Sequence, residues 1–566
     1  MLKRITILIV LVLFIGIQDG LSQASLVPVY HQVYDWMHYQ RVRGNAPLYN
    51  YEALPLTRGQ ITSILAQIDE SKLNSGDQHV RNSYLREFSV DSLRKYETNS
   101  FIQGSDKFYN RGKDILFSDE EPHLYVWDDE NATIAFDWFP GRGAVFVEDG
   151  DLIYNAPYYT IGGVRSYGTF SGTLGFHHEQ WRAVEVGDDE AFLYLPFLSR
   201  NWKTLNNTGS NKYHMNTSAG FHKSYWSLHI GRGMLKYGVG QRNNLVYSRE
   251  SIPFDWVRLN INSKYVRYSL IHGFLSWDSG RQREIEGFDN LYTRTSPNRF
   301  TVHQKFQFQP AEWISIGYYE LINYSNRKIE LAYINPVNRL AYMEWELQDQ
   351  DNGFAGFEGV LRPFDGLELF GEILVDDLGD AKDLFRWEEK KASNSTFARY
   401  LGFSYAMKTG TVLSSSYQRV EPAIYAHKFQ LNSHSEKGIS LGSQIGPNGD
   451  ELSFQIEQWF SHRTRITFRY DYDRQGLNYF DGNGEFVDVG GDILDSYQPD
   501  PVTGGVIKPS EFLAGDLHRW NRFTVEATYE PWRGIRLRGE YSLRSMLEGE
   551  QLNDLSIFNF TLQVGY

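Results

Sequence analysis

Few residues in this chain have the types and spacing that catalysis needs. Ser440 lies in Gly438-Ile-Ser-Leu-Gly442, which matches the Gly-x-Ser-x-Gly pattern of a nucleophile elbow. That pattern activates serine only at a strained strand-to-helix turn with a histidine and an acid nearby. Here the flanking residues alternate in polarity and lead into Gly446-Pro447. We therefore interpret the match as coincidence, assign no catalytic residue and expect no enzyme activity.

Two short patterns contain side chains that metal ions bind. His177-His178-Glu179 has two imidazoles, but neighbouring residues on a strand point to opposite faces, so both cannot reach one ion. Asp481, Asn483 and Glu485 alternate with glycines like part of a calcium loop, without the full loop pattern or its closing bidentate glutamate. We interpret this stretch as a solvated acidic loop, with calcium as the alternative and no other cofactor.

Aromatic side chains are the best chemical match to a sugar ligand, because the C–H faces of sugars stack on rings. The longest irregular stretch, residues 473–519, and its end supply four candidates for ligand binding: Tyr479, Phe480, Tyr497 and Trp520. The chain contains 37 Tyr, 36 Phe and 14 Trp, so the alternative is that these four belong to an interfacial girdle or pack within the loop.

The composition narrows the class of protein. Cysteine is absent, which excludes disulfides, thiolate metal sites, a cysteine nucleophile and a lipoprotein anchor. The net charge of −14 argues against a nucleic-acid partner. After the N-terminus no segment offers the roughly 18 uninterrupted apolar residues of a membrane-spanning helix. A membrane protein of this kind must close a sheet on itself to satisfy its backbone.

The N-terminus has the pattern of a secretory signal peptide. Lys3 and Arg4 precede the apolar run Ile5–Ile17, and small residues follow up to Ser22. We predict that residues 1–22 are removed by cleavage near Ser22. The mature protein then leaves the cytoplasm.

The next segment, residues 23–100, has helical rather than alternating spacing. Val33, Trp36 and Met37 fall on one helical face, and Thr57 with Gln60 forms a capping box before a second apolar stripe. A third stripe includes Tyr84 and Phe88. We predict three or so short amphipathic helices that form a small periplasmic segment or a plug for a barrel.

Residues 101–566 alternate with a period of two, broken by turn clusters. The final segment shows this best, with Phe558, Phe560, Leu562, Val564 and Tyr566 on one face. Strands of about ten residues, apolar towards lipid and polar towards the lumen, are typical of outer-membrane barrels. We predict an all-β transmembrane barrel of about 16–18 antiparallel strands. Phe558–Tyr566 is the segment that we expect the barrel-assembly machinery to recognise.

Turn lengths predict orientation, because such barrels keep their periplasmic turns short. Residues 408–410, 461–464 and 530–534 are then periplasmic, and residues 473–519 are extracellular. Several arginines fall on inward-facing positions: Arg465, Arg469, Arg536, Arg538 and Arg544. Free arginines would make an anion-attracting channel, whereas pairing with Glu457, Glu526 and Glu540 would fill the lumen. The mixed charges favour pairing.

Several stretches of the chain resemble the Wzi-like capsule-assembly family of outer-membrane barrels, in its Bacteroidetes-type form. They are His229-Ile-Gly-Arg-Gly-Met-Leu-Lys-Tyr-Gly-Val-Gly-Gln241 with Leu245–Ser248 and Ile252–Phe254, Ile334-Asn-Pro336, Leu369-Phe-Gly-Glu372, Gly438–Asp450 and Pro55-Leu-Thr-Arg58. The resemblance implies an 18-stranded barrel with a helical bundle at its periplasmic end. These motifs resemble determinants of strands and turns, and they provide no sugar-contact residue to carry over.

The resemblance also implies a function: a lectin-like surface protein that helps attach capsular or exported polysaccharide. We therefore expect an outer-membrane location, with lipid and polysaccharide as partners. Two alternatives stay open from the sequence. One is a porin or substrate channel, and the other is a surface protein of gliding motility or adhesion, as similar proteins in gliding bacteria are.

Overall fold

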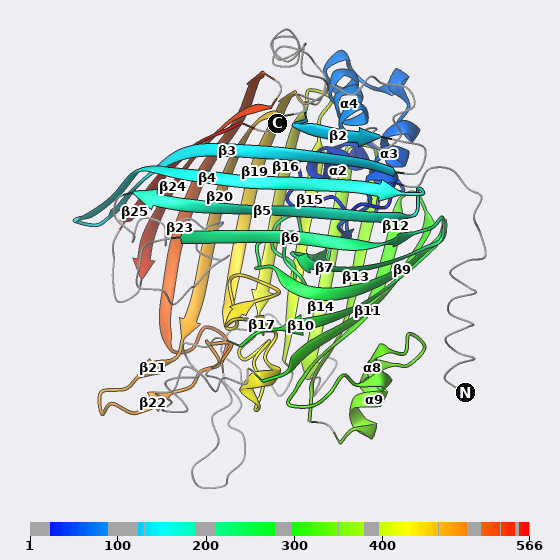
Figure 1. The fold of residues 1–566 in the computed structure, drawn as a ribbon. Coiled ribbons are helices and arrows are strands. Elements are labelled where there is room, and N and C mark those ends of the chain that lie inside the picture. Colours follow the sequence, from blue (N-terminus) through cyan, green and yellow to red (C-terminus); the bar gives the residue numbers. More distant parts are fainter. Residues whose placement is uncertain are drawn as a thin grey trace.

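The chain forms a closed antiparallel barrel, with helices at both ends (Figure 1). The computed structural model describes residues 23–88, 123–128, 132–186, 211–277, 297–348, 350–377, 396–461, 463–494, 511–532, 534–548 and 554–564. The predicted signal peptide and Tyr566 lie outside these ranges. The sheet closes where β25 pairs with β3. The short β2 pairs with β3 alone, so eighteen of the nineteen hydrogen-bonded strands make the wall, within the range of 16–18 that the sequence predicted.

The wall strands follow one another around the barrel in chain order. They are β3 (Ala132–Asp149), β4 (Leu152–Phe170), β5 (Leu174–Val186), β6 (Asn211–His222), β7 (Trp226–Gly233), β9 (Phe254–Asn262), β10 (Val266–Leu275), β11 (Arg299–Ala311), β12 (Ile314–Ser325), β13 (Asn352–Phe364), β14 (Leu367–Asp377), β15 (Thr396–Ala406), β16 (Thr411–Val420), β19 (Gly449–Ser461), β20 (Thr464–Leu477), β23 (Asp516–Trp532), β24 (Ile535–Glu548) and β25 (Asp554–Val564).

Short elements complete the structure. The small strands are β1 (Ala53–Leu54), β2 (Tyr125–Asp128), β8 (Lys236–Tyr237), β17 (Ser435–Glu436), β18 (Ile439–Ser440), β21 (Tyr479–Phe480) and β22 (Phe486–Val487). The helices are α2 (Val33–Val42), α3 (Arg58–Gln67), α4 (Ser75–Phe88), α8 (Leu331–Ile334) and α9 (Leu340–Glu346), with 3-10 turns η1 (Glu70–Lys72) and η5 (Gln430–Asn432). None of the helices in the described ranges is long and apolar enough to cross a membrane.

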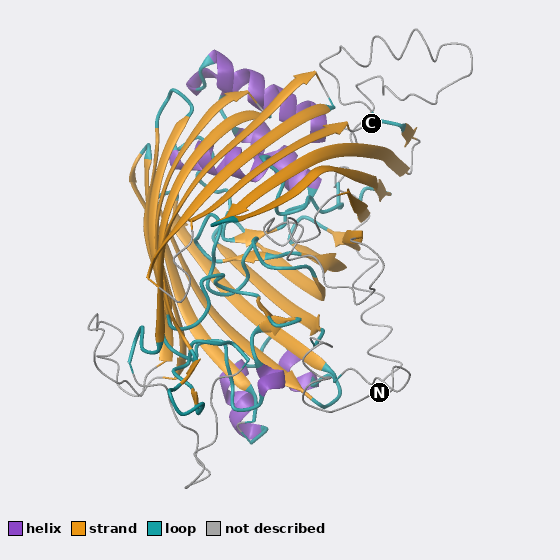
Figure 2. Cartoon of the chain, turned by 90° about the vertical axis from the view of Figure 1, so that its left-hand side faces the viewer, coloured by secondary structure: helices purple, strands orange, loops and turns teal. Residues whose placement is uncertain are grey.

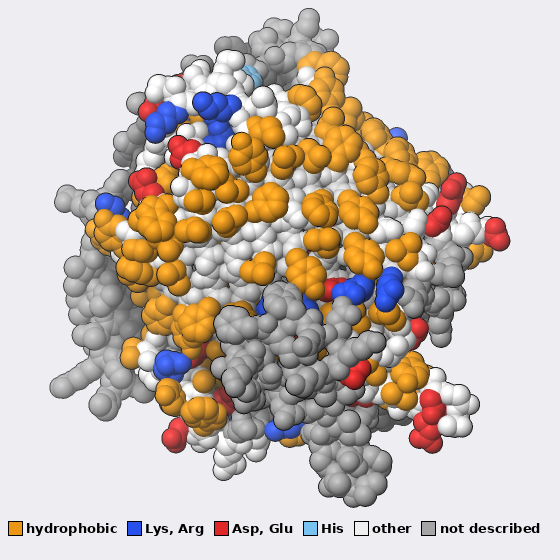
Figure 3. Space-filling model, turned by 180° about the vertical axis from the view of Figure 1, so that it is seen from behind, with side chains coloured by type: hydrophobic (Ala, Val, Ile, Leu, Met, Phe, Trp, Pro, Cys, Tyr) orange, Lys and Arg blue, Asp and Glu red, His pale blue; other side chains and the backbone are white. Residues whose placement is uncertain are grey.

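The wall has an apolar exterior, and most of its polar side chains lie on the inner face. On β25, Phe558 and Phe560 are 45% and 39% exposed, whereas Asn559 between them is buried on the inner face. The same alternation on the other strands produces a broad apolar surface around the outside (Figure 3). An apolar exterior of this kind is what a barrel presents to lipid.

The two ends of the barrel differ in their connections. We call the end with the β15–β16, β19–β20 and β23–β24 turns the short-turn end, and the opposite end the long-loop end. The three turns predicted to lie on one side therefore do so. The predicted loop 473–519 lies at the long-loop end, but its strands extend further, so the loop spans only residues 478–515.

Helices α2, α3 and α4 lie at the short-turn end, and α8 and α9 at the long-loop end (Figures 1 and 2). The Thr57–Gln60 capping box begins α3 as predicted. The amide of Asn74 donates to the carbonyl of Lys408 in the β15–β16 turn, at 2.6 Å. The three predicted helices are therefore confirmed, and they contact the barrel end.

Candidate functional site

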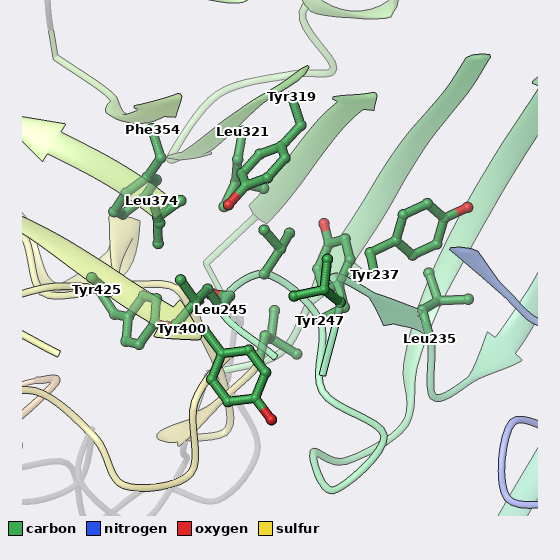
Figure 4. Close-up of a cluster of buried hydrophobic side chains, with 14 of the residues drawn as sticks. Leu235, Tyr237, Leu245, Tyr247, Tyr319, Leu321, Phe354, Leu374, Tyr400 and Tyr425 are labelled. Carbon is green, nitrogen blue, oxygen red and sulfur yellow. Dashed lines mark hydrogen bonds between the residues drawn. The ribbon is translucent and has the colours of Figure 1, made fainter. Parts of the chain in front are cut away.

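The lumen contains protein rather than open space along much of its length. Two long connections from the long-loop end fold inward: the β7–β9 loop (residues 234–253) and the β16–β19 loop (residues 421–448). Their apolar side chains are almost fully buried against inward-facing wall residues (Figure 4). The buried loop residues include Leu235, Tyr237, Leu245, Tyr247, Ile424, Tyr425 and Leu441, and the wall residues include Tyr319, Leu321, Leu374 and Tyr400.

Hydrogen bonds join the two inward loops to each other. The amide of Ser248 donates to the carbonyl of Leu441 at 2.8 Å, and the Tyr425 hydroxyl donates to the carbonyl of Leu245 at 2.8 Å. His434 Nε2 lies 2.7 Å from the carbonyl oxygen of Val246. These bonds satisfy backbone groups that would otherwise be buried without a partner.

The N-terminal segment meets the inward loops inside the barrel. Strand β1 pairs with β8, matching Ala53 with Tyr237. Lys236 Nζ donates to the carbonyl of Tyr51 at 2.7 Å, and Lys305 on the wall donates to the carbonyl of Glu52 at 2.9 Å. We call residues 23–88 together with the two inward loops the plug.

This arrangement corrects one sequence interpretation. The stretches around 229–254 and 438–450 were expected to determine strands and turns. Most of their residues instead form the inward loops. Their glycines, tyrosines and small polar residues pack within the lumen and hydrogen-bond there, which is a packing role that period-two alternation does not indicate.

Beside the plug lies a charged cavity of about 140 Å³. Helix α2, the β7–β9 loop and the inner faces of β16, β19, β20 and β23 line it. Its charged lining residues are Asp35, Arg242, Arg249, Glu250, Glu457, Arg465, Arg469 and Glu526. The four arginines and four carboxylates balance, so the cavity carries no formal net charge.

Asp35 on α2 connects the three structures that enclose the cavity. Its two carboxylate oxygens lie 2.7 Å from Arg249 of the β7–β9 loop and 2.9 Å from Arg465 of the wall. Burial alone would raise the pKa of Asp35, but the two guanidinium groups outweigh it and hold the pKa well below its ordinary value. Asp35 therefore stays ionised and links the N-terminal segment to both partners.

The inward arginines are largely paired, as predicted. Arg465 also contacts Glu457 at 3.2 Å, and Arg538 contacts Glu526 and Glu540, each at 3.0 Å. Arg469 pairs with Asp471 at 3.0 Å, a partner that was not predicted.

The remaining two inward arginines have different surroundings. The Arg544 guanidinium lies over the Trp520 ring, 4.4 Å from its centroid. Arg536 is half-buried on the same inner face.

The candidate metal and nucleophile motifs have structural roles. Glu179 faces inward, accepts a hydrogen bond from the Tyr30 hydroxyl at 2.5 Å and pairs with Arg165 at 2.8 Å. Across the described ranges no three potential ligands among His, Cys, Asp and Glu form a metal cluster. The Ser440 hydroxyl accepts a hydrogen bond from the amide of Gly442 within the β16–β19 loop, which is a local turn contact.

The predicted calcium loop is a hairpin turn between β21 and β22. One carboxylate oxygen of Asp481 accepts hydrogen bonds from the amides of Asn483 and Glu485, at 2.8 and 2.9 Å. These bonds lower the pKa of Asp481. Gly484 has a φ of +81°, which the turn requires and glycine tolerates. Asp481 therefore stabilises the turn that holds the two short strands together.

The same hairpin exposes aromatic rings at the long-loop end. Phe480 is 71% exposed, and its ring centroid lies 5.5 Å from that of Phe486 in an edge-to-face pair. Tyr479 is 38% exposed beside them. The structure thus brings two of the predicted aromatic residues together with Phe486, which the sequence reasoning missed. The signal that could have found it is the pair of apolar dipeptides, Tyr479-Phe480 and Phe486-Val487, on either side of the polar turn.

The other two aromatic candidates do not join this group. Trp520 was expected at the end of the loop but lies in β23, only 8% exposed and facing the lumen. Strand β23 begins at Asp516, so the wall has already started when the chain reaches Trp520. Tyr497 lies outside the described residues.

No protein-family model matches the chain, and no curated protein sequence matches it. Among solved structures, the fold is similar to Wzi of Escherichia coli, an outer-membrane protein involved in group 1 capsule assembly and a carbohydrate-binding β-barrel. The TM-score is 0.53 at 11% identity, covering 96% of this chain and 99% of Wzi. This likeness shows a shared barrel fold.

Two outer-membrane proteins of Pseudomonas aeruginosa match less well. OpdK has a TM-score of 0.42 at 8% identity, covering 76% of this chain and 98% of its own. OprD has a TM-score of 0.41 at 11% identity, covering 76% and 93% respectively. At these scores the two structures carry no argument about this chain.

Proposed function

We propose that this protein is a non-enzymatic outer-membrane barrel that binds capsular or exported polysaccharide and helps attach or assemble it at the cell surface. The observation that carries the proposal is the plugged lumen. Among the residues that the structure describes, the N-terminal segment and the two inward loops fill the barrel and leave no wide passage for a long polymer. Recognition then falls to the surfaces outside the lumen at the long-loop end, which we place on the cell exterior.

The exposed β21–β22 hairpin supports this proposal chemically. Phe480, Phe486 and Tyr479 present ring surfaces to solvent, and the turn that holds them is fixed by Asp481. Rings held in this way can stack on the apolar faces of sugars. The likeness to Wzi supports the same class of ligand, because carbohydrate binding is attributed to that protein.

The wall supports the outer-membrane location. Its exterior is apolar, and the outward Phe558 and Phe560 lead towards the C-terminus at the short-turn end. We propose that this final segment, up to Tyr566, is what the barrel-assembly machinery recognises. The short-turn end then lies in the periplasm with α2, α3 and α4.

The proposal is tested in a strain that lacks this protein. We expect surface-retained polysaccharide to fall while total synthesis is unchanged, measured by separating cell-bound from released polymer. Restoring the wild-type chain should restore retention. If the deletion strain retains its polysaccharide as before, the proposed function is wrong.

A second candidate is a substrate channel, and the charged cavity is the observation that favours it. A cavity of about 140 Å³ beside α2 has room for a few waters rather than for a sugar chain. The channel candidate predicts steady conductance of the wild-type protein in planar bilayers, whereas the proposed binder predicts almost none. A role in gliding motility or adhesion is a variant of the binding function. The phenotype of the deletion strain distinguishes it from a role in polysaccharide attachment.

A further inference from the structure

The connection between β12 and β13 leaves the barrel rim and folds over the outside of the wall. We call residues 326–348, which include α8 and α9, the α8–α9 unit. Beneath it the outward-facing wall residues Val302, Ile322 and Tyr324 are at most 1% exposed. On the same strands towards the short-turn end, the outward-facing Phe308 and Ile316 are 50% and 49% exposed. The unit therefore covers wall that would otherwise contact lipid.

Specific contacts fix the unit against the wall. Glu320 faces outward on β12, yet it is only 3% exposed. Its carboxylate accepts a hydrogen bond from the amide of Leu340 at 2.6 Å and pairs with Arg339 at 2.7 Å. The Tyr333 hydroxyl donates to Asp351 at 2.6 Å. A carboxylate on the apolar exterior would be costly without such partners, so its pairing indicates a permanent covering rather than a loose flap.

The far side of the unit is itself apolar. Leu331 is 76% exposed, Val337 86%, Tyr342 53% and Trp345 64%. The exposed charged residues of the same unit are Lys328, Arg339 and Glu346, two basic and one acidic. Aliphatic and aromatic side chains beside basic residues are the composition of segments that lie in the boundary between lipid headgroups and acyl chains.

This apolar surface is continuous with the exposed wall. The Arg339 guanidinium lies over the Tyr318 ring, 5.5 Å from its centroid. Tyr318 pairs across the sheet with Phe306 on one side and Phe357 on the other, and these are 47% and 58% exposed. The α8–α9 unit packs on a lipid-facing wall and adjoins its exposed surface. The side of the unit that points away from the wall therefore faces lipid.

We propose that the α8–α9 unit is a membrane-interface anchor, whose occupant is the headgroup and acyl boundary of the bilayer around the barrel. Leu331, Val337 and Trp345 insert into that boundary, and Lys328 faces its anionic groups. This inference rests on the proposed placement in a membrane but not on polysaccharide binding. It assigns to one long loop a role in holding the barrel rather than in recognising a ligand.

The absence of cysteine from the chain allows a clean test with single spin labels. Val337→Cys carries the test label, Phe308→Cys is the wall control and Asn483→Cys, on the β21–β22 hairpin, is the solvent control. Each labelled full-length protein is reconstituted in vesicles of phosphatidylcholine and phosphatidylglycerol. Power saturation then compares the access of oxygen, which concentrates in lipid, with that of a water-soluble nickel complex. Heat-dependent migration on gels verifies that each variant is folded.

We expect the Val337 label to favour oxygen over nickel at least threefold more than the Asn483 label does, approaching the Phe308 label. A Val337 label that behaves like the Asn483 label overturns the anchor. A Val337 label shielded from both reagents also overturns it, in favour of contact with a second copy of this chain. If the Phe308 label is itself open to nickel, the proposed membrane placement fails instead.

Discussion

The β7–β9 loop and the α8–α9 unit are both long connections at the same end of the barrel, yet they fold in opposite directions. The first enters the lumen and the second lies over the outer wall. Inside, Leu245 and Tyr247 are at most 1% exposed, and neighbouring polar groups such as Ser248 are bonded to the other inward loop. Outside, Leu331 and Val337 remain largely exposed.

The difference shows what each environment requires of a loop. A loop inside the barrel must satisfy every polar group with protein partners, because little water reaches it. A loop on the outer wall has only to satisfy the groups beneath it, such as Glu320, and can leave apolar side chains exposed where lipid replaces water. Hydrophobic residues thus stabilise folding in the first case and membrane contact in the second.

The largest expected effect is the loss of Asp35, which joins the plug to the wall. Replacing Asp35 with Ala leaves Arg249 and Arg465 without their shared partner in a mostly buried site. Breaking a buried ion pair in this way costs about 3–5 kcal/mol. We expect the plug to loosen, with a lower unfolding temperature and channel openings in planar bilayers that the wild type lacks.

The control for this variant is Lys72→Ala, at an exposed position on the same N-terminal segment. This change is expected to alter neither property. Equal openings in both variants would show that Asp35 does not hold the plug.

A leucine pair tests the comparison of the two loops directly. Leu245→Ala removes a fully buried side chain from the plug and should cost about 3 kcal/mol of stability in urea unfolding. Leu331→Ala removes an equally large side chain from the α8–α9 unit, where 76% of it is exposed, and should cost almost nothing in detergent. Similar losses for the two variants would contradict the distinction between an inward core and an outward lipid contact.

The sequence predicted the wall and the helices well, because both are periodic. Alternation along Phe558–Val564 identifies a strand without knowledge of its partner, and the Thr57–Gln60 capping box identifies the start of α3. Trp520 was wrongly assigned to the loop because β23 begins with Asp516, His518 and Arg519. Polar residues of this kind are typical of a loop. Where a strand extends beyond the apolar band, its outer face does not contact lipid, so its sequence need not alternate between apolar and polar residues.

The sequence predicted the N-terminal helices as a periplasmic segment or a plug, but it did not predict the two inward loops as part of the plug, because their contacts are far apart in the chain. Ser248 bonds to Leu441, and Asp35 reaches Arg249 and Arg465. Neither inward loop has a period that reveals which face is buried. The pairing of the inward arginines was predictable because acidic residues share the inner face with them. Asp35, on a helix outside the alternating region, was not among the expected partners.

Acid should weaken the link between the plug and the wall. The pKa of Asp35 is lower in the folded protein than its ordinary value of about 3.9. Its stabilising contribution is therefore complete above that value and falls as the pH drops below it, by up to about 1.4 kcal/mol per pH unit.

The stability difference between the wild type and Asp35→Asn should thus be largest at neutral pH and shrink between pH 4 and pH 2, measured by tryptophan fluorescence in urea. A constant difference across that range would mean that the carboxylate charge is not what stabilises the plug.

The smallest expected effect concerns the hairpin that we propose for sugar contact. Phe480→Ala removes the more exposed ring of the Phe480–Phe486 pair. A stacking contact between such a ring and a ligand contributes about 1 kcal/mol. We expect affinity for the polysaccharide to fall about fivefold in a binding assay with purified protein, with the unfolding temperature unchanged. Phe308→Ala, which removes a ring that is 50% exposed on the outer wall, is the control and should leave affinity as it is. If Phe308→Ala weakens binding as much as Phe480→Ala, the assay reports general apolar contact. The β21–β22 hairpin is then not a recognition surface distinct from the lipid-facing wall.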